Sequence, residues 1–217
     1  TQNDLMKLVY ATDFDSKNDL IKRWLGIGSI NVFGRPFAGK DTQGQKLADL
    51  FNGTLLGGGQ ILRNSVIPEK AKALQSRGEL IPSEDYVNIV LPYLSQASLK
   101  GRPLILSSVG RWVGEEMGVI QATKEAGHEL KCVIYLELDE AQVRTRWSAL
   151  EDHDDRGGRH DDTQEVLEKR LEEFREKTLP VIDAYEKSGL LIRIDGSESP
   201  ETVLQSILDA LASRASL

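Results

Sequence analysis

The sequence is nearly free of cysteine and has no long apolar run. One cysteine among 217 residues, Cys132, excludes an internal disulfide framework and a thiolate zinc cluster. No apolar stretch approaches the ~20 residues that a membrane-spanning helix needs, and the N-terminus lacks the basic and apolar segments of a secretory signal. We therefore expect a cytoplasmic protein with no membrane partner, in which Cys132 is a small core residue.

The charge balance is acidic. A formal net charge of -7 argues against a broad basic surface for nucleic acid, although an acidic protein can still gather Arg and Lys in one cleft for an anionic ligand. Hydrophobic residues make up 40% of the chain and charged residues 28%, a balance typical of globular proteins with a substantial core. We expect one compact domain that binds no nucleic acid.

Short apolar runs alternate with longer amphipathic ones along the chain. Such alternation is typical of βα units around a parallel sheet, so the predicted fold class is α/β. The predicted strands are residues 30–33, 103–106, 132–138 and 190–194, with a fifth through 53–56. The predicted helices are residues 40–51, 83–94, 115–126, 140–150, 163–188 and 200–212.

A separate segment precedes the first predicted strand. Residues 18–25 have the pattern of an amphipathic helix that ends at Gly26. We predict a helical extension over residues 1–28 that packs on the core and carries no chemistry, followed by one domain over residues 29–217. Trp24 has a second interpretation, contact with a partner protein.

The first predicted strand leads into a loop that reads GRPFAGKDT over residues 34–42. Glycines at such positions let backbone N–H groups converge on phosphate oxygens, and the dipole of the following helix favours negative charge. A lysine at the end of the loop, here Lys40, reaches the β and γ phosphates of a bound nucleotide. The alternative is an ordinary glycine turn, because the general pattern has Ser or Thr after the lysine, where this chain has Asp41.

Further motifs follow the loop. They are GGGQILR at residues 57–63, GELIP at 78–82, SSVGR at 107–111, RHDD at 159–162, KRL at 169–171 and TLPVI at 178–182. Together with the loop, read as Gly-x-Pro-x-x-Gly-Lys-x-Thr-Gln, they resemble the adenylate kinases and related nucleoside monophosphate kinases with a short lid. The resemblance extends from about residue 30 to about residue 211.

The resemblance implies a P-loop NTPase-type parallel sheet flanked by helices. It also implies a helical insert that binds the nucleoside monophosphate at about residues 57–86 and a short lid at about residues 148–160. The implied enzyme is a monomer that uses ATP with Mg²⁺ and transfers a phosphoryl group to a nucleoside monophosphate, with AMP as the expected acceptor. Two alternatives stay open: a nucleotide-binding regulatory protein of the same fold, and a kinase for another acceptor such as GMP.

The resemblance also assigns the site residues. For ATP binding they are Gly34, Phe37, Ala38, Gly39, Lys40, Asp41, Thr42, Arg146 and Gly196. For acceptor binding they are Gly58, Arg63, Leu80, Ile81, Ser108, Arg111, Glu115, Gln121, Arg159 and Arg170. The catalytic set is Lys40, Arg111, Arg146, Arg159 and Arg170, since phosphoryl transfer needs mainly positioning and neutralisation of charge. We expect no direct side-chain ligand for the metal, with Thr42 as the one candidate. In the alternative interpretation, Arg146 and Arg170 pair with carboxylates of neighbouring helices.

The chain departs from the family pattern on the ATP side. Phe37 and Asp41 stand where these kinases usually carry glycine, and Ser107 stands where they carry an aspartate that organises water around magnesium. The Asp41 carboxylate would repel bound triphosphate unless it is paired or turned outward, and we expect Arg35 to offset part of its charge. Asp41 or a water molecule is the candidate to replace the missing aspartate.

The base of the acceptor is read in this family by a threonine and a glutamine. Their positions hold Gly58 and Glu115 in this chain. Because the helix after Arg111 has extra residues, Gln121 is a second candidate for the glutamine's role. A carboxylate at Glu115 would suit the N–H donors of guanine better than adenine, so AMP and GMP both stay candidates.

Overall fold

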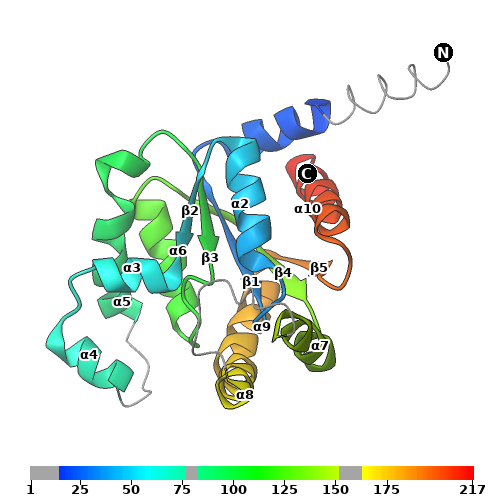
Figure 1. Ribbon diagram of the computed structural model, residues 1–217. Coiled ribbons are helices and arrows are strands. Elements are labelled where there is room, and N and C mark those ends of the chain that lie inside the picture. Colours follow the sequence, from blue (N-terminus) through cyan, green and yellow to red (C-terminus); the bar gives the residue numbers. More distant parts are fainter. Residues whose placement is uncertain (1–14, 77–82, 152–162) are drawn as a thin grey trace.

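The computed structural model describes residues 15–76, 83–151 and 163–217 (Figure 1). Within these residues five strands form one sheet in the order β2-β3-β1-β4-β5, and all neighbouring strands pair in parallel. The strands are β1 Ser29–Gly34, β2 Thr54–Gly57, β3 Leu104–Ser107, β4 Leu130–Glu137 and β5 Leu191–Asp195. The predicted α/β fold class is therefore confirmed.

Helices connect the strands. They are α2 (Lys40–Phe51), α3 (Gly58–Asn64), α4 (Glu69–Ser76), α5 (Ser83–Leu94), α6 (Glu115–Glu125), α7 (Glu140–Glu151), α8 (Gln164–Glu173), α9 (Leu179–Lys187) and α10 (Pro200–Ala215), with a 3-10 turn at Ala97–Leu99 and a π-helical turn at Phe174–Thr178. A further helix covers residues 15–25. The apolar periodicity does not predict α3 and α4, since α3 begins with two glycines, which are typical of loops. In the described part of the chain, no helix has the length and apolar composition of a membrane span.

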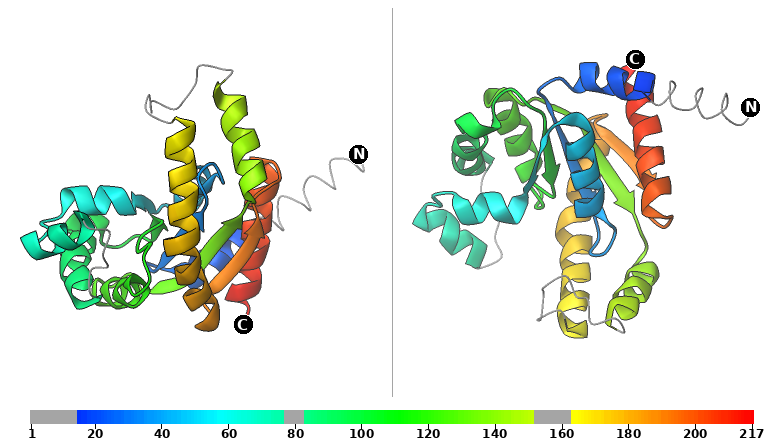
Figure 2. Two further views of the ribbon diagram at one scale, coloured as in Figure 1. Left: turned by 90° about the horizontal axis from the view of Figure 1, so that it is seen from below. Right: turned by 45° about the horizontal axis from the view of Figure 1, so that its top comes forward.

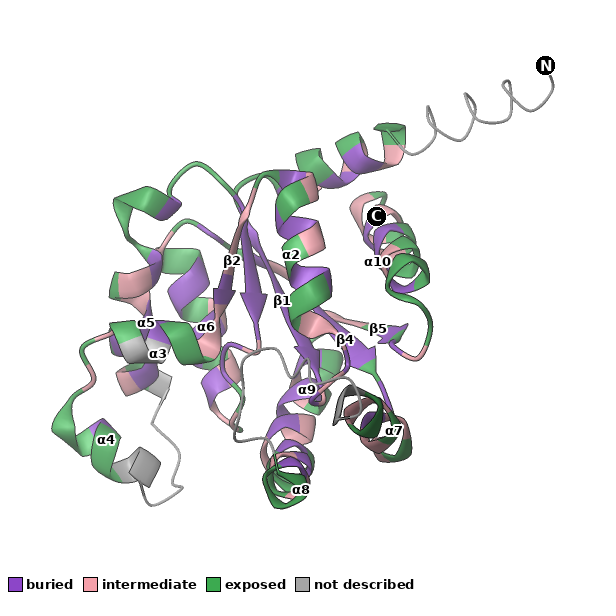
Figure 3. Cartoon of the chain, viewed as in Figure 1, coloured by how far each residue is buried: buried purple, intermediate pink, exposed green. Residues whose placement is uncertain are grey.

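Helices cover both faces of the sheet, and the alternation of side chains along β1 decides which residue meets which layer. Ile30 and Val32 pack on one face with α2, α10 and the helix of residues 15–25. Phe33 packs on the opposite face with α5, α6 and α9. Burial of every residue of β1 is visible in Figure 3 and is typical of a central parallel strand.

The helix of residues 15–25 is packed on this core, as the sequence predicts. Ile21 and Leu25 are 0% and 1% exposed and belong to the cluster on the face of α2 and α10. Lys17 also forms an ion pair with Asp209 of α10. Trp24 is half-buried against the same cluster.

The long helix predicted over residues 163–188 is interrupted. α8 passes into the π-helical turn Phe174–Thr178, which continues into α9. Pro180 lies in the first turn of α9, and because proline has no N–H it cannot continue the ladder of helical hydrogen bonds. Phe174 is buried in this turn, with the guanidinium of Arg35 over its ring. The Phe174 ring also stacks on Tyr135 of β4, so the interruption lies where this helical segment packs against the sheet.

The ends of β1 and β3 lie at a topological switch point, where the helices that follow the two strands go to opposite faces of the sheet. β1 lies between β3 and β4, and α2 follows β1 on one face whereas α6 follows β3 on the other. Ligands of open α/β sheets bind outside the carboxyl ends of the strands at such a point. The register pairs Val32 of β1 with Ser107 of β3, so the loops that follow these two strands begin side by side.

A buried asparagine joins β1 to the loop that follows β3. Asn31 of β1 is 0% exposed, and its Nδ2 donates to the carbonyl of Val109, 2.8 Å away. The Oδ1 of Asn31 accepts from the N–H of Val109 at 3.2 Å. One side chain therefore satisfies both backbone groups of a residue just beyond β3.

Asn31→Ala should lower the free energy of unfolding by about 2–6 kcal/mol, because it leaves two buried backbone groups unpaired at about 1–3 kcal/mol each. Urea denaturation followed by circular dichroism measures the change. Gln45→Ala on the exposed face of α2 is the matched control and should stay within about 0.5 kcal/mol of the unmodified protein. Equal losses in the two variants would contradict the role given to Asn31.

Candidate active site

The loop of residues 34–42 joins β1 to α2 in a conformation that suits an anion. Gly39 is the N-cap of α2 at φ 85°, in the left-handed region that favours glycine. No side chain of the described residues caps α2, so the N–H groups of its first turn are directed toward the loop. Phe37 also has a positive φ, 63°, although a non-glycine residue adopts this conformation at a cost of about 1–2 kcal/mol. Phe37 thus departs from glycine in sequence but keeps a glycine-like backbone.

The loop residues differ in exposure. Gly34 and Ala38 are buried, Lys40 is half-buried, and Asp41 and Thr42 are exposed. Of the three polar residues in the first turn of α2, Asp41 and Thr42 therefore lie at the surface and Lys40 is partly covered.

The Asp41 carboxylate is paired. The hydroxyl of Ser107, at the end of β3, donates to Oδ1 of Asp41 at 2.6 Å. The Nζ of Lys40 lies 3.5 Å from Oδ2. Arg35, which we expected to offset this charge, instead donates to the Tyr135 hydroxyl at 3.0 Å and to a carbonyl at the end of β4. Ser107 and Lys40 therefore take the role that the sequence suggested for Arg35.

Arg146 of α7 brings three of the predicted ATP-binding residues together. Its Nη1 donates to the carbonyl of Phe37 at 3.0 Å. Its Nη2 donates to the carbonyls of Gly196 at 2.7 Å and Ser197 at 3.2 Å, in the turn after β5. Arg146 therefore binds backbone carbonyls where the alternative interpretation expected helix carboxylates. Ser197 was not predicted, because a contact through a backbone carbonyl has no side-chain signature.

Two residues of the predicted acceptor side also meet. Gly58 is the first residue of α3, and a Cβ added there would lie 2.5 Å from the carbonyl oxygen of Ser108. Only glycine permits this approach without displacing the backbone. Arg111, two residues beyond Val109, is exposed, and its carbonyl accepts from the Thr178 hydroxyl at 3.2 Å.

The two candidates for reading the base lie in different environments. Glu115, the first residue of α6, is 7% exposed and its Oε2 accepts from the N–H of Trp112 at 3.2 Å. The N–H of Glu115 donates back to the carbonyl of Trp112, so these two residues close the turn that leads into α6. Gln121 is exposed and donates to Glu125 at 2.8 Å. Both assignments stay predictions.

Other predicted residues are placed only in part. Leu80, Ile81 and Arg159 lie outside the described residues, as does most of the predicted lid, residues 148–160. Arg63 lies on α3, but its side chain is not described. Arg170 is half-buried on α8. The roles given to these residues stay predictions.

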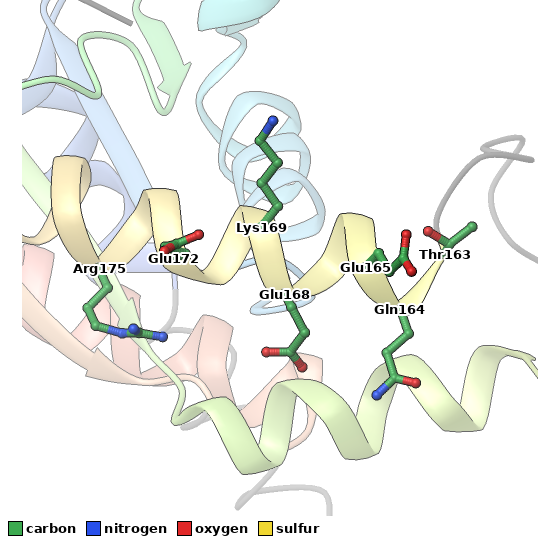
Figure 4. A pocket seen from close by; sticks show the side chains of 7 residues that line it. All are labelled: Thr163, Gln164, Glu165, Glu168, Lys169, Glu172 and Arg175. Carbon is green, nitrogen blue, oxygen red and sulfur yellow. The ribbon is translucent and has the colours of Figure 1, made fainter.

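The helices on either side of the predicted lid, α7 and α8, run side by side away from the sheet (Figure 2). A hollow of about 1020 Å³ lies along α8 and is lined by Thr163, Gln164, Glu165, Glu168, Lys169, Glu172 and Arg175 (Figure 4). Glu168 accepts from Arg144 of α7 at 2.7 Å, and Arg175 donates to Glu140 at 3.0 Å. Ion pairs thus link α7 to α8 and to the π-helical turn beside this hollow, and we assign the hollow no chemistry.

Oxygen donors lie at the edge of the sheet beside the loop. Within the described ranges, no group of three or more His, Cys, Asp or Glu residues could hold a metal ion. The carboxylate of Asp41 and the hydroxyls of Ser107 and Thr42 are nevertheless the hard donors that Mg²⁺ prefers, and Mg²⁺ with bound phosphates keeps several waters. This donor set fits a Mg²⁺ ion that arrives with ATP.

The parallel sheet and the loop at the N-terminus of α2 define a P-loop nucleotide-binding protein. A model of the adenylate kinase family matches residues 32–190. An adenylate kinase of Synechococcus sp. (strain CC9902) is 31% identical over 183 residues, which cover 82% of this chain and 95% of the relative. An adenylate kinase of Thermus thermophilus is 30% identical over 193 residues, 86% and 99% of the two chains. That of Rhizobium meliloti (strain 1021) is 33% identical over 187 residues, 82% and 97% of the two chains.

The chain therefore belongs to the adenylate kinase family. Membership confirms the resemblance found in the sequence and the prediction of a nucleoside monophosphate kinase.

Glu115 makes the stability of the protein depend on pH. Burial raises the pKa of its carboxyl from the ordinary 4.5 to about 7, although the Trp112 N–H and the Arg111 charge lower it. Between pH 4.5 and about 7 the unfolded chain has released this proton while the folded chain still holds it. Stability is therefore fully present below pH 4.5 and falls as pH rises to about 7.

Glu115→Gln should remove this loss, because glutamine does not ionise. The variant should be stabilised relative to the unmodified protein by about 2–3 kcal/mol more at pH 8 than at pH 4.5, since one pKa unit corresponds to about 1.4 kcal/mol. Thermal or urea unfolding at the two pH values measures the difference. Glu125→Gln, at the exposed end of α6, is the control. A gain for Glu115→Gln that is the same at both pH values would show that ionisation of Glu115 is not the cause.

Proposed function

We propose that the protein transfers the terminal phosphoryl group of ATP to AMP, which yields two molecules of ADP. The proposal rests on the phosphate-binding loop between β1 and α2, with Arg146 anchored to its backbone, in a chain of the adenylate kinase family. AMP is the proposed acceptor because the relatives carry the name adenylate kinase.

ATP binds at the loop in this proposal. The N–H groups of Gly39 and of the first turn of α2 hold the phosphates of ATP, and Lys40 neutralises charge on the oxygens of the β and γ phosphates. Arg146 approaches from α7 at the carbonyls of Phe37 and Gly196, so its guanidinium spans the loop and the turn after β5. That turn supports the adenine side of ATP.

The acceptor binds on the opposite side of the β1 and β3 ends. Arg63 and Arg111 grip its phosphate, since a planar guanidinium offers two parallel donors to phosphate oxygens. The nucleoside lies against the insert of residues 57–86, where Gly58, Leu80, Ile81 and Ser108 line the pocket and Glu115 or Gln121 reads the base. Close contact between Gly58 and the carbonyl of Ser108 supports a joint role for these two residues.

Transfer requires alignment of the two phosphates and neutralisation of the charge between them. Arg146, Arg159 and Arg170 supply that charge, with Arg159 carried by the lid of residues 148–160. Once the site is closed to water, each donor acts in a medium of low dielectric constant and stabilises the transition state more strongly. No side chain of the protein forms a covalent bond in this mechanism.

Magnesium, when bound with ATP, supplies further neutralisation of phosphate charge, and Thr42 and Asp41 are the residues of the loop that would hold it. We further propose that the protein works as a monomer in the cytoplasm, with residues 1–28 as an extension and residues 29–217 as the kinase. The single cysteine supports a reducing compartment, because a chain with one cysteine has no internal disulfide. Cys132 itself is an inert thiol, since it is buried and burial raises its pKa to about 12.

An assay of ADP formation from ATP with each of AMP, GMP, CMP, UMP and dTMP tests the proposed function. We expect turnover with magnesium, and the highest kcat/KM with AMP. Highest activity with GMP would instead favour guanine recognition by Glu115. ATP binding without turnover on any acceptor would replace the proposal with a regulatory role.

Lys40→Ala should lower kcat by at least about 10²-fold, the usual cost of removing one donor to transition-state charge. Its melting temperature should hardly change, because Lys40 pairs with the exposed Asp41 carboxylate, and surface pairs contribute about 0–1 kcal/mol. Lys46→Ala is the matched control on the same helix, where Lys46 pairs with the exposed Glu201, and it should keep full activity. An unfolded Lys40→Ala protein, or one with unchanged kcat, would mean that the loop has another role.

A further inference from the structure

Two residues that depart from the family pattern touch each other. Ser107 ends β3, is 5% exposed, and donates from Oγ to Oδ1 of Asp41 at 2.6 Å. Asp41 is the second residue of α2, and its side chain is 66% exposed. These residues are 66 positions apart in sequence and meet because β1 and β3 pair in parallel.

The pair holds a carboxylate at the place where ATP phosphates are proposed to bind. Hydrogen bonding to Ser107 fixes one oxygen of Asp41, and the other lies 3.5 Å from Nζ of Lys40. An acidic group in the first turn of a helix is favoured by the helix dipole, so it is stable there before any ligand binds. Phosphate oxygens brought beside it would nevertheless be repelled.

A divalent cation reverses the sign of that interaction. Mg²⁺ binds ATP through phosphate oxygens and keeps several of its waters, and a nearby carboxylate accepts hydrogen bonds from those waters. In P-loop proteins this ion is served by a hydroxyl of the loop and by one aspartate. This chain has the Thr42 hydroxyl beside Asp41, and the end of β3 offers a hydroxyl instead of a carboxylate.

We propose that Asp41, oriented by Ser107, is the positioning residue for the magnesium ion of bound ATP, so that α2 supplies the carboxylate and β3 supplies its support. The inference rests on the proposed function, because it assumes that ATP binds at this loop. It makes the affinity for ATP depend strongly on magnesium: Asp41 opposes the bare nucleotide and favours the metal complex.

The test compares the Kd of an ATP analogue with a non-hydrolysable β–γ bridge in magnesium and in EDTA, by calorimetry on the full chain. The quantity of interest is the ratio of the Kd in EDTA to the Kd in magnesium. Asp41→Asn keeps an acceptor for Ser107 but loses the charge, and should lower this ratio by about 10–100-fold, the usual effect of an outer-sphere partner on metal affinity. Ser107→Ala should lower it less, because the carboxylate stays but is no longer oriented.

An exchange of the two residues tests whether the metal dependence can be restored. Asp41→Ser combined with Ser107→Asp returns the carboxylate to β3 and should recover most of the ratio that Asp41→Asn loses. Asp49→Asn, on the exposed face of α2, is the control and should leave the ratio unchanged. Melting temperatures confirm that each variant is folded.

Electron paramagnetic resonance of Mn²⁺ gives a readout that does not depend on turnover. Addition of the analogue to the unmodified protein should tighten Mn²⁺ binding. Asp41→Asn should weaken Mn²⁺ binding in this complex by about the same factor by which it lowers the ratio in calorimetry. The inference is overturned if Asp41→Asn leaves the ratio unchanged. It is equally overturned if Asp41→Asn strengthens analogue binding by the same factor in magnesium and in EDTA, because Asp41 would then act only by repulsion of the phosphates.

The two proposals fail separately. Turnover of ATP and AMP by the unmodified protein, with an unchanged ratio in Asp41→Asn, would reject the role of Asp41 and keep the kinase. Absence of turnover, with the ratio lowered in Asp41→Asn, would reject the kinase and keep the role of Asp41.

Discussion

Parallel pairing of β1 with β3 and β4 brings the polar groups of the candidate active site to one edge of the sheet. Because all three strands run the same way, the loops that leave their carboxyl ends begin at one edge of the sheet. The phosphate loop leaves β1, Ser107 ends β3, and the carbonyl that anchors Arg35 follows β4. Asn31 strengthens the arrangement from inside, since it binds both backbone groups of Val109. If this register shifted by one residue, the side chains of β1 would exchange faces and the edge would lose its alignment.

Contacts at this edge also explain how an unusual loop is tolerated. Phe37 keeps the positive φ that glycine would adopt, and its carbonyl accepts from Arg146. Asp41 introduces a negative charge, and Ser107 and Lys40 hold it in a defined position. Residues 41 and 107, which are far apart in sequence, are thus one local structure, in which α2 carries the carboxylate and β3 the hydroxyl that supports it.

Much of the fold could be predicted from the sequence because its signals are local. Apolar runs marked the strands, and the glycines and lysine of the loop marked the start of α2. The apolar periodicity did not mark α3, whose glycines are typical of loops, although the family resemblance implied a helical insert there. The π-helical turn was missed because the apolar pattern continues through residues 174–178 without a break. Family resemblance supplied the site residues, of which the structure brings together Phe37, Arg146 and Gly196, and also Gly58 and Ser108. The direction of Arg35 and the partner of Asp41 could not be predicted, because each depends on a neighbour that only the sheet brings near.

Central to this account is that one edge of the sheet binds the phosphates of both nucleotides, ATP and the acceptor. The most direct test is a titration of ¹⁵N-labelled protein with a bisubstrate analogue that joins two adenosines through a polyphosphate chain, followed by amide spectra. We predict that the signals of Gly39 to Thr42 and those of Ser108 to Arg111 shift together and saturate at one analogue per chain. Shifts confined to one of these two loops, or saturation at two analogues per chain, would contradict the claim.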